Sequence, residues 1–240
     1  MNIAVIFAGG VGKRMVGSAM PKQFLKLLDK PVLIHTLQYF EECDDIDVIV
    51  ISMVESHIDL TLKLIKKYSI NKVKKVVPGG ETGQLSIYNG LCAAKEISTS
   101  DKDIVLIHDG VRPLITEDLI KKNIESVKKY GSAISCVHQK ETTVLSFDEN
   151  DILGTTDRAN TWIARAPQSF YLNDILEAHN KCLENNITEM IDSCSMMLHF
   201  NKKLKIVETL SENIKITTPD DFFLAKAIIQ ARENNDIFGG

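Results

Sequence analysis

Short apolar runs rich in β-branched residues alternate along this chain with longer segments whose apolar residues recur at helical spacing. The runs expected to form strands lie at 3–7, 48–52, 73–77, 104–107 and 133–137. The segments expected to form helices lie between them, at 31–42, 57–68, 82–97 and 116–130. Strands separated by helices form βαβ units, so the pattern predicts a Rossmann-like α/β fold, with a mostly parallel sheet flanked by helices.

The alternation changes between about residues 140 and 170, where segments are shorter and more polar and turn residues gather. We expect a β-arm at about 139–165 that projects from a single domain spanning residues 1–240. The elements expected beyond it are helices at 172–184 and 192–199, short strands at 204–207 and 214–217, and a last helix that starts at Pro219 and ends near Arg232.

Composition excludes several classes of protein. Hydrophobic residues make up 44% and charged residues 25% of the chain, which is typical of a globular protein without a membrane span. A formal charge of −4 gives no general attraction to nucleic acid. The five cysteines are scattered, which favours neither a disulfide framework nor a zinc site. Because no secretory leader is visible either, we expect a cytoplasmic protein.

A glycine-rich loop follows the first expected strand, at the edge where open α/β sheets bind their ligands. Gly9, Gly10 and Gly12 allow backbone N–H groups to approach an anion, and Lys13 and Arg14 add positive charge. The loop is therefore a candidate phosphate-binding site.

Two common phosphate motifs are excluded by spacing. A dinucleotide fingerprint needs its third glycine where this chain has Met15, and a Walker loop needs glycine at Phe7 and serine or threonine at Arg14. This disfavours a nicotinamide-dependent dehydrogenase. Lys22 returns a third cation toward the loop, and three cations beside a glycine loop suit a triphosphate.

Several motifs together resemble one enzyme family. They are Ala-Gly-Gly-Val-Gly-Lys-Arg-Met at 8–15, Pro-Lys-Gln-Phe at 21–24, His-Asp-Gly-Val-Arg-Pro at 108–113, Asp-Arg at 157–158, Pro-Gln-Ser-Phe at 167–170 and Asn-Ile-Lys-Ile-Thr-Thr-Pro at 213–219. Their residues and their order resemble the motifs of the cytidylyltransferases that act on 2-C-methyl-D-erythritol 4-phosphate or D-ribitol 5-phosphate. The resemblance implies an enzyme that uses CTP and Mg²⁺, binds a small polyol phosphate and releases pyrophosphate.

The resemblance also implies residue roles. The catalytic residues would be Arg14, Lys22, Arg158 and Lys215. The CTP-binding residues would be Phe7, Ala8, Gly9, Gly10, Val11, Gly12, Lys13, Gly79, Gly80, Glu81, Ser86 and Asp109, with Asp109 also the metal ligand. The acceptor-binding residues would be Arg112, Thr142, Arg158 and Lys215. Thr142 and Arg158 would serve the partner's active site, since the family exchanges its arms within a homodimer.

Three positions depart from the family pattern. Gly83 replaces an arginine in the cytosine loop, Ala166 replaces a threonine before the Pro-Gln pair, and Glu141 replaces an aspartate. The gap between Arg14 and Lys22 is one residue longer than in the methylerythritol enzyme, which favours the ribitol branch.

Three functions therefore stay open. The favoured one is synthesis of CDP-ribitol for teichoic acid or capsule. The first alternative is the methylerythritol step of isoprenoid synthesis. The second, of another class, is a non-catalytic CTP-binding regulator, prompted by Gly83 and Ala166.

Overall fold

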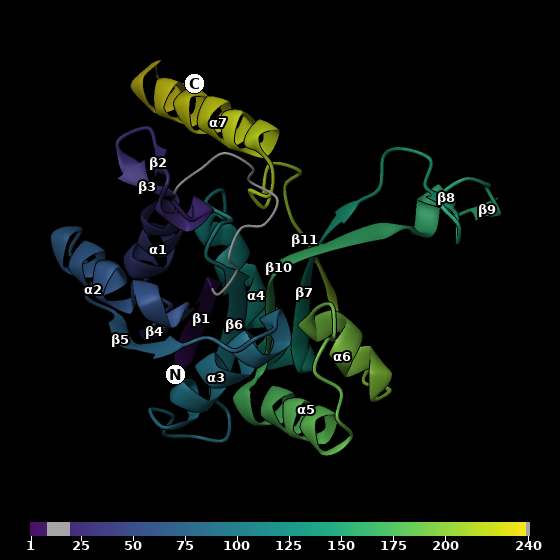
Figure 1. Cartoon of the computed structure of the whole chain (residues 1–240), viewed down its shortest axis with the longest axis horizontal. Coiled ribbons are helices and arrows are strands. Elements are labelled where there is room, and N and C mark those ends of the chain that lie inside the picture. The colour runs from purple at the N-terminus through teal and green to yellow at the C-terminus, as the bar shows by residue number, and fades with distance from the viewer. Residues whose placement is uncertain (9–19, 239–240) are drawn as a thin grey trace.

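One seven-stranded sheet runs through the centre of the molecule (Figure 1). The structure is a computed structural model and describes residues 1–8 and 20–238. The strand order is β11-β7-β10-β6-β1-β4-β5, and every neighbouring pair is parallel except the two that involve β10. Its strands are β1 (Asn2–Ala8), β4 (Val48–Met53), β5 (Val73–Pro78), β6 (Ile104–Asp109), β7 (Ser132–His138), β10 (Trp162–Tyr171) and β11 (Ile206–Glu208).

The predicted mostly parallel α/β sheet is confirmed, with two errors in detail. Strand β10, ten residues long and antiparallel to both β6 and β7, was not predicted as part of the sheet. The prediction of a strand at 214–217 was wrong, because this segment forms no strand ladder with the described residues. Ile216 N donates to Val111 O at 2.9 Å. Two short hairpins complete the strands: β2 (Lys26–Leu27) with β3 (Lys30–Pro31), and β8 (Val144–Leu145) with β9 (Gly154–Thr155).

The predicted helices are confirmed, and the last one extends beyond its predicted end. The helices are α1 (Val32–Glu42), α2 (Ile58–Lys67), α3 (Gly83–Lys95), α4 (Glu117–Tyr130), α5 (Leu172–Glu184), α6 (Ser193–His199) and α7 (Pro219–Phe238), with short 3-10 turns at Lys22–Phe24, Glu55–His57 and Arg158–Asn160. Local sequence explains their ends. Thr116 caps α4 by accepting a bond from Leu119 N at 3.3 Å, and Gly131 ends it with a φ of 83°.

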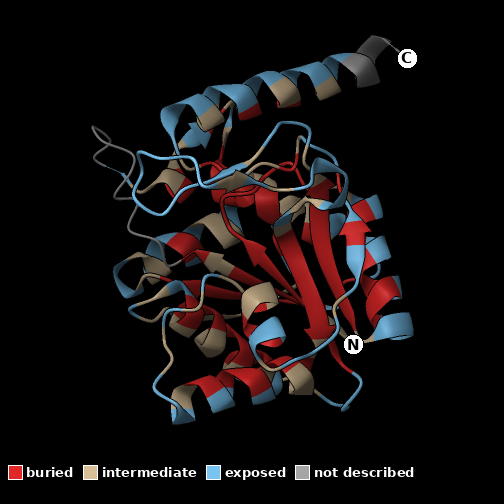
Figure 2. Cartoon of the chain, turned by 90° about the vertical axis from the view of Figure 1, so that its right-hand side faces the viewer, coloured by how far each residue is buried: buried red, intermediate tan, exposed pale blue. Residues whose placement is uncertain are grey.

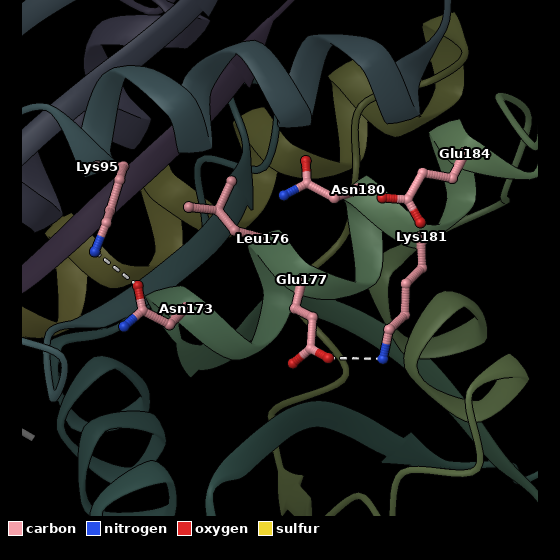
Figure 3. A pocket seen from close by; sticks show the side chains of 7 residues that line it. All are labelled: Lys95, Asn173, Leu176, Glu177, Asn180, Lys181 and Glu184. Carbon is pink, nitrogen blue, oxygen red and sulfur yellow. Dashed lines mark hydrogen bonds and ion pairs between the residues drawn. The ribbon is translucent and has the colours of Figure 1, made fainter.

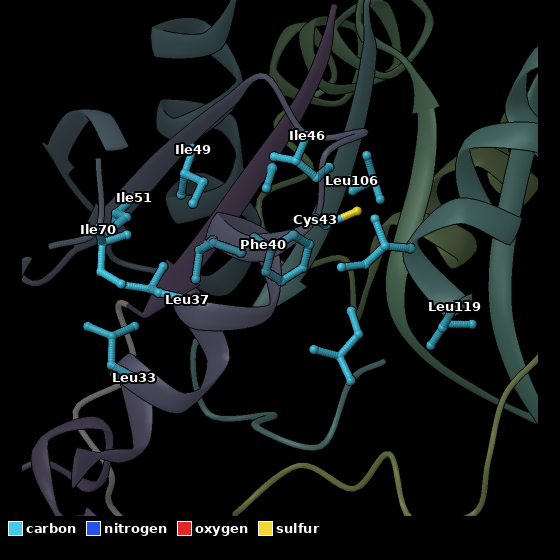
Figure 4. Close-up of a cluster of buried hydrophobic side chains, with 14 of the residues drawn as sticks. Leu33, Leu37, Phe40, Cys43, Ile46, Ile49, Ile51, Ile70, Leu106 and Leu119 are labelled. Carbon is cyan, nitrogen blue, oxygen red and sulfur yellow. The ribbon is translucent and has the colours of Figure 1, made fainter. Parts of the chain in front are cut away.

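The core lies on both faces of the sheet, because alternate side chains of each strand point to opposite faces. On one face, Ile49 and Ile51 pack with Leu37 and Phe40 of α1 (Figure 4). On the other, Val50 packs among residues of α3, α5 and α6. Figure 2 shows the buried strands as the interior layer. The helices therefore hold the strands in one register and fix the position of every strand end.

Two parts of the chain extend from this body. Residues between β7 and β10 project from the sheet and carry β8 and β9 at their far end; we call residues 139–161 the arm (Figure 1). Helix α7 packs through Ala225 and Ile229 on a third apolar cluster that includes Leu27 and Ile216. Within residues 1–8 and 20–238, no helix is long and apolar enough to cross a membrane.

Candidate active site

Asp109 is the centre of a buried group of charged side chains at the carboxyl end of the sheet. It is the last residue of β6, and the parallel register places it beside Phe7 of β1. Its Oδ1 lies 2.6 Å from Lys215 Nζ, and its Oδ2 accepts a bond from Arg112 Nε at 3.1 Å. Burial favours the neutral carboxyl, but the charges of Arg112 and Lys215 outweigh it and lower the pKa of Asp109 to about 2. The carboxylate is therefore ionised at neutral pH.

Arg112 links this carboxylate to a segment far along the chain. It follows β6 in a turn closed by its own N–H to Asp109 O at 3.2 Å, and it is 7% exposed. Its Nη1 donates to the backbone oxygen of Asn213 at 2.7 Å. Asn213 Nδ2 in turn donates to Ala166 O at 2.7 Å, so one asparagine connects the loop after β11 to β10.

Lys22 contacts the segment that carries Lys215, although the two are distant in sequence. Lys22 Nζ donates to Ile216 O at 2.9 Å, which places the lysine beside the segment that carries Lys215. The buried neighbour Gln23 donates to Ala8 O at 3.2 Å and fixes this turn to the end of β1. Lys215 Nζ also lies 5.7 Å from the Phe7 ring centroid. Lys215 and Arg112 thus contact one carboxylate, and Lys22 lies beside the segment that carries Lys215.

His108 is a core residue behind the charged cluster. Its ring is fully buried and packs edge-on against Phe40, with centroids 5.2 Å apart. Its Nε2 lies 3.1 Å from Arg112 O. Burial first, and then the charge of Arg112, lower its pKa to about 4, so the ring is neutral at pH 7.

The loop before α3 lies at the end of β5, across the sheet from β10. Gly79 N donates to Met53 O at 2.7 Å, and Ser86 Oγ accepts from Gly80 N at 3.0 Å. A Cβ on Gly80 would lie 2.3 Å from the Cβ of Leu85, so only glycine fits there. Ser86 is buried and its hydroxyl holds the loop together, whereas Glu81 is exposed.

Comparison with known proteins decides the family. Residues 2–231 match the family described as IspD, 2-C-methyl-D-erythritol 4-phosphate cytidylyltransferase. The chain belongs to this family.

Relatives differ in the acceptor that their names give. The chain is 53% identical over 239 residues, covering 100% of both chains, to a ribitol-5-phosphate cytidylyltransferase of Vibrio parahaemolyticus. It is 38% identical to a 2-C-methyl-D-erythritol 4-phosphate cytidylyltransferase of Clostridium botulinum, covering 95% of this chain and 97% of that one. A solved 4-diphosphocytidyl-2C-methyl-D-erythritol synthase from Anaerococcus prevotii superposes with a TM-score of 0.82 at 28% identity, covering 95% and 96% of the two chains. The predicted family and enzyme class, cytidylyltransferase, are thereby confirmed.

The structure gathers some predicted site residues of this cytidylyltransferase and not others. Phe7, Ala8, Lys22, Asp109, Arg112 and Lys215 meet at the carboxyl ends of β1 and β6. Thr142 and Arg158 are exposed on the arm, which extends away from this end of the sheet within one chain (Figure 1). The predicted residues Gly9, Gly10, Val11, Gly12, Lys13 and Arg14 lie outside the described residues.

Three residues of this region had no role in the sequence interpretation. Gln23 and Asn213 occur inside the family motifs, and the structure shows that both connect separate segments of the site. Arg165 donates to Asn213 O at 2.7 Å and so lies next to Arg112. The sequence held one signal for this residue: Arg165 is a cation directly before Ala166, a position that departs from the family pattern.

The described residues offer few metal ligands. Across residues 1–8 and 20–234, no three side chains among histidine, cysteine, aspartate and glutamate gather as a metal site. Asp109 is the carboxylate at the centre of the cluster, and both its oxygens already contact cations. A Mg²⁺ ion here would take most of its ligands from phosphate oxygens and water, as this ion commonly does.

A groove of about 480 Å³ between α3 and α5 has a different character (Figure 3). Its two lysines are paired, Lys181 with Glu177 at 2.6 Å and Lys95 with Asn173 at 2.8 Å, and Glu184 adds a negative charge. It offers no gathered charge for an anionic substrate.

Proposed function

We propose that this cytidylyltransferase transfers the cytidylyl group of CTP to D-ribitol 5-phosphate and forms CDP-ribitol. The identity to ribitol-5-phosphate cytidylyltransferases carries this proposal, because it is 51% to 53% over the full length, against 38% for the methylerythritol relatives. The longer spacing between Arg14 and Lys22 in the sequence agrees with it. Such a product suits a polymer precursor, as in teichoic acid or capsule.

The chemistry requires charge neutralisation more than proton transfer. An oxygen of the acceptor phosphate attacks the α-phosphorus of CTP, and the bond from that phosphorus to the departing pyrophosphate breaks. Negative charge grows on the α-phosphate oxygens and on the pyrophosphate. Lys22 is bonded to the segment that carries Lys215, and Lys215 is held by Asp109; preorganised cations stabilise such a transition state. We assign Lys22 and the loop residue Arg14 to the α-phosphate and the pyrophosphate.

Asp109 has two roles in this proposal. Its ionised carboxylate holds Arg112 and Lys215 in place before substrates arrive. It would also contact the ribose of CTP or help to hold Mg²⁺, which when bound would neutralise phosphate charge. The glycines at 79 and 80 lie in the loop that reads cytosine through backbone groups, with Ser86 supporting that loop.

We further propose a homodimer with exchanged arms, in which Thr142 and Arg158 complete the partner's acceptor site. The exposure of both residues and of the arm's apolar side chains supports this, since Phe147 is 89% and Ile152 is 68% exposed. The body and the arm together would form one functional domain over residues 1–240. A cytoplasmic location stays a prediction from the sequence.

The test is pyrophosphate release with CTP and Mg²⁺, comparing ribitol 5-phosphate with 2-C-methylerythritol 4-phosphate at equal concentration and with UTP as the nucleotide control. A clear preference for ribitol 5-phosphate is the expected result. Preference for methylerythritol phosphate would favour the isoprenoid step instead. CTP binding without turnover of any polyol phosphate would favour the non-catalytic regulator.

A further inference from the structure

Arg165 is a cation of the site region to which no role has been assigned. It lies in β10 at the irregular part of its pairing with β7, between Ala164 and Gln168. Its side chain is half-buried, and its Nη1 donates to Ser211 O at 3.2 Å and to Asn213 O at 2.7 Å. Arg165 is therefore held against the loop that follows β11.

Arg165 and Arg112 share one acceptor. Both donate through Nη1 to the same backbone oxygen of Asn213, each at 2.7 Å. The two guanidinium groups must therefore be neighbours. Arg112 is compensated by the carboxylate of Asp109 at 3.1 Å, whereas no carboxylate in residues 1–8 and 20–234 forms an ion pair with Arg165.

The surroundings of Arg165 leave positive charge in excess. Burial, and then the charge of Arg112, lower the pKa of Arg165. The backbone oxygens of Ser211 and Asn213 supply dipoles but no net charge. The glycine loop at 9–19 cannot supply a carboxylate either, because its sequence contains no aspartate or glutamate. Buried charges in proteins are generally paired, and within residues 1–8 and 20–234 Arg165 has no carboxylate as a partner.

We propose that Arg165 binds the phosphate group of the acceptor, together with Arg112. This inference rests on the proposed function, since it names a residue for the acceptor of that reaction. Two adjacent guanidinium groups offer parallel N–H donors, which suit the oxygens of a phosphate monoester. From the same subunit, Arg165 would hold the attacking phosphate in position.

The strand order explains why the ligand is the acceptor and not the base of CTP. Arg165 lies on β10, and the loop with Gly79 and Gly80 follows β5. Three strands, β6, β1 and β4, separate β10 from β5. At about 4.8 Å per strand, these two parts of the site are roughly 19 Å apart. Arg165 is thus on the side of the site opposite the nucleotide loop.

Arg165→Gln tests the assignment, because the amide keeps a donor for the backbone oxygens while the charge is removed. We expect the KM for ribitol 5-phosphate to rise about 10- to 100-fold and the KM for CTP to stay within about twofold. Inorganic phosphate competes with the acceptor, and its inhibition constant should rise by a similar factor. Arg165→Lys should recover part of the acceptor affinity, because it restores the charge without the planar fork.

Arg232→Gln is the matched control. Arg232 contacts Glu212 at 2.9 Å, so it holds the same loop from α7 without belonging to the proposed phosphate site. This variant should leave both KM values unchanged. An unchanged acceptor KM in Arg165→Gln, or an equal rise of both KM values, would overturn the proposal and give Arg165 a structural role.

Calorimetric titration with inorganic phosphate separates this inference from the proposed function. If the wild-type protein turned over no polyol phosphate, the proposed function would fail. Loss of phosphate binding in Arg165→Gln, with binding retained in Arg232→Gln, would still support an anion site at Arg165. Equal phosphate binding by wild-type protein and Arg165→Gln would reject it.

Discussion

The cluster around Asp109 and the arm carry the two halves of the predicted site, and they differ in how the fold supports them. Asp109 and Arg112 are buried, and each makes several charged or backbone contacts. Thr142 and Arg158 are exposed on a two-stranded projection. The first group is preorganised by one chain alone. The second group is remote from it within one chain, which is why the proposed function gives it to a second copy.

Substitution of Asp109 should have the largest effect, because the carboxylate balances two cations. In Asp109→Asn, Arg112 and Lys215 lose their charged partner and their fixed positions. We expect kcat/KM to fall about 100- to 1,000-fold and the free energy of unfolding to fall by about 3 kcal/mol. Activity assays and urea denaturation measure the two effects. Asp151→Asn on the arm, where the residue is exposed, should change neither. Near-wild-type values for Asp109→Asn would remove Asp109 from the centre of the site.

Lys22→Ala, compared with Lys26→Ala, tests whether activity depends on a lysine inside the site or on any lysine nearby. Lys22 is tied to Ile216 O, beside Lys215, whereas Lys26 is exposed four residues later. Loss of one preorganised cation should lower turnover at least about 100-fold, with the fold retained. Lys26→Ala should retain full activity. Equal turnover by the two variants would contradict the role assigned to Lys22.

The sequence predicted the sheet well because β-branched runs of strand length were bounded by helical segments. It missed β10, whose run is interrupted by Arg165 and Pro167 and so lacks a continuous apolar pattern. It wrongly predicted a strand at 214–217. There the alternation of Ile214 and Ile216 reflects packing in the cluster under α7 and not strand pairing.

The contacts of the site were beyond prediction from residues alone. Lys215 and Asp109 are 106 positions apart, and Lys22 and Ile216 are 194 apart. Only the family resemblance named these residues together. Arg165 belongs to none of the family motifs. Its contact with Asn213, on which the proposed role depends, is made by the loop after β11.

Mixing subunits tests whether the arm acts across a dimer. Arg158→Ala and Lys22→Ala should each be impaired alone. A mixed dimer contains one site with both residues intact if the arm serves its partner, so random mixing should recover about a quarter of wild-type activity. The measurement is turnover after co-refolding, with heterodimers verified by tagged copies.

Lys22→Ala mixed with Lys215→Ala is the control for this experiment. Both lysines belong to the body of one chain, where Lys22 Nζ bonds Ile216 O, next to Lys215 in the sequence. No mixed dimer then contains an intact site, so no recovery is expected. Absence of recovery in the Arg158 mixture would place the arm's contribution within its own subunit. Recovery in the control would instead show that Lys22 and Lys215 do not act in the same site.

The pH profile gives a smaller effect that tests the buried half alone. Asp109 has a pKa of about 2 and His108 of about 4, so neither changes charge between pH 5 and 8. The acceptor phosphate, with a second pKa of about 6, should therefore control kcat/KM, which should fall about tenfold per pH unit below it. Stability should also fall as the pH falls, but in a lower pH range. Because the folded pKa of Asp109 is depressed, its contribution is complete above pH 4 and is lost as pH falls toward 2. A bell-shaped profile with a group near pH 7 would indicate an enzyme acid or base that this site lacks.

Two glycines provide the smallest contrast between the body and the arm. A Cβ on Gly80 would meet Leu85 Cβ at 2.3 Å, whereas a Cβ on Gly154 in the arm would meet nothing within 4 Å. Gly80→Ala should therefore lower the free energy of unfolding by about 1–3 kcal/mol and raise the KM for CTP, because the nucleotide loop must shift. Gly154→Ala should stay within about 0.5 kcal/mol of wild type. Gly83→Ala, also with open space around it, is the control inside the same loop region, and it should leave stability unchanged or slightly raised. Thermal denaturation of the three variants checks this order. A larger loss of stability in Gly154→Ala than in Gly80→Ala would show that the arm is packed as tightly as the loop at residues 79 and 80.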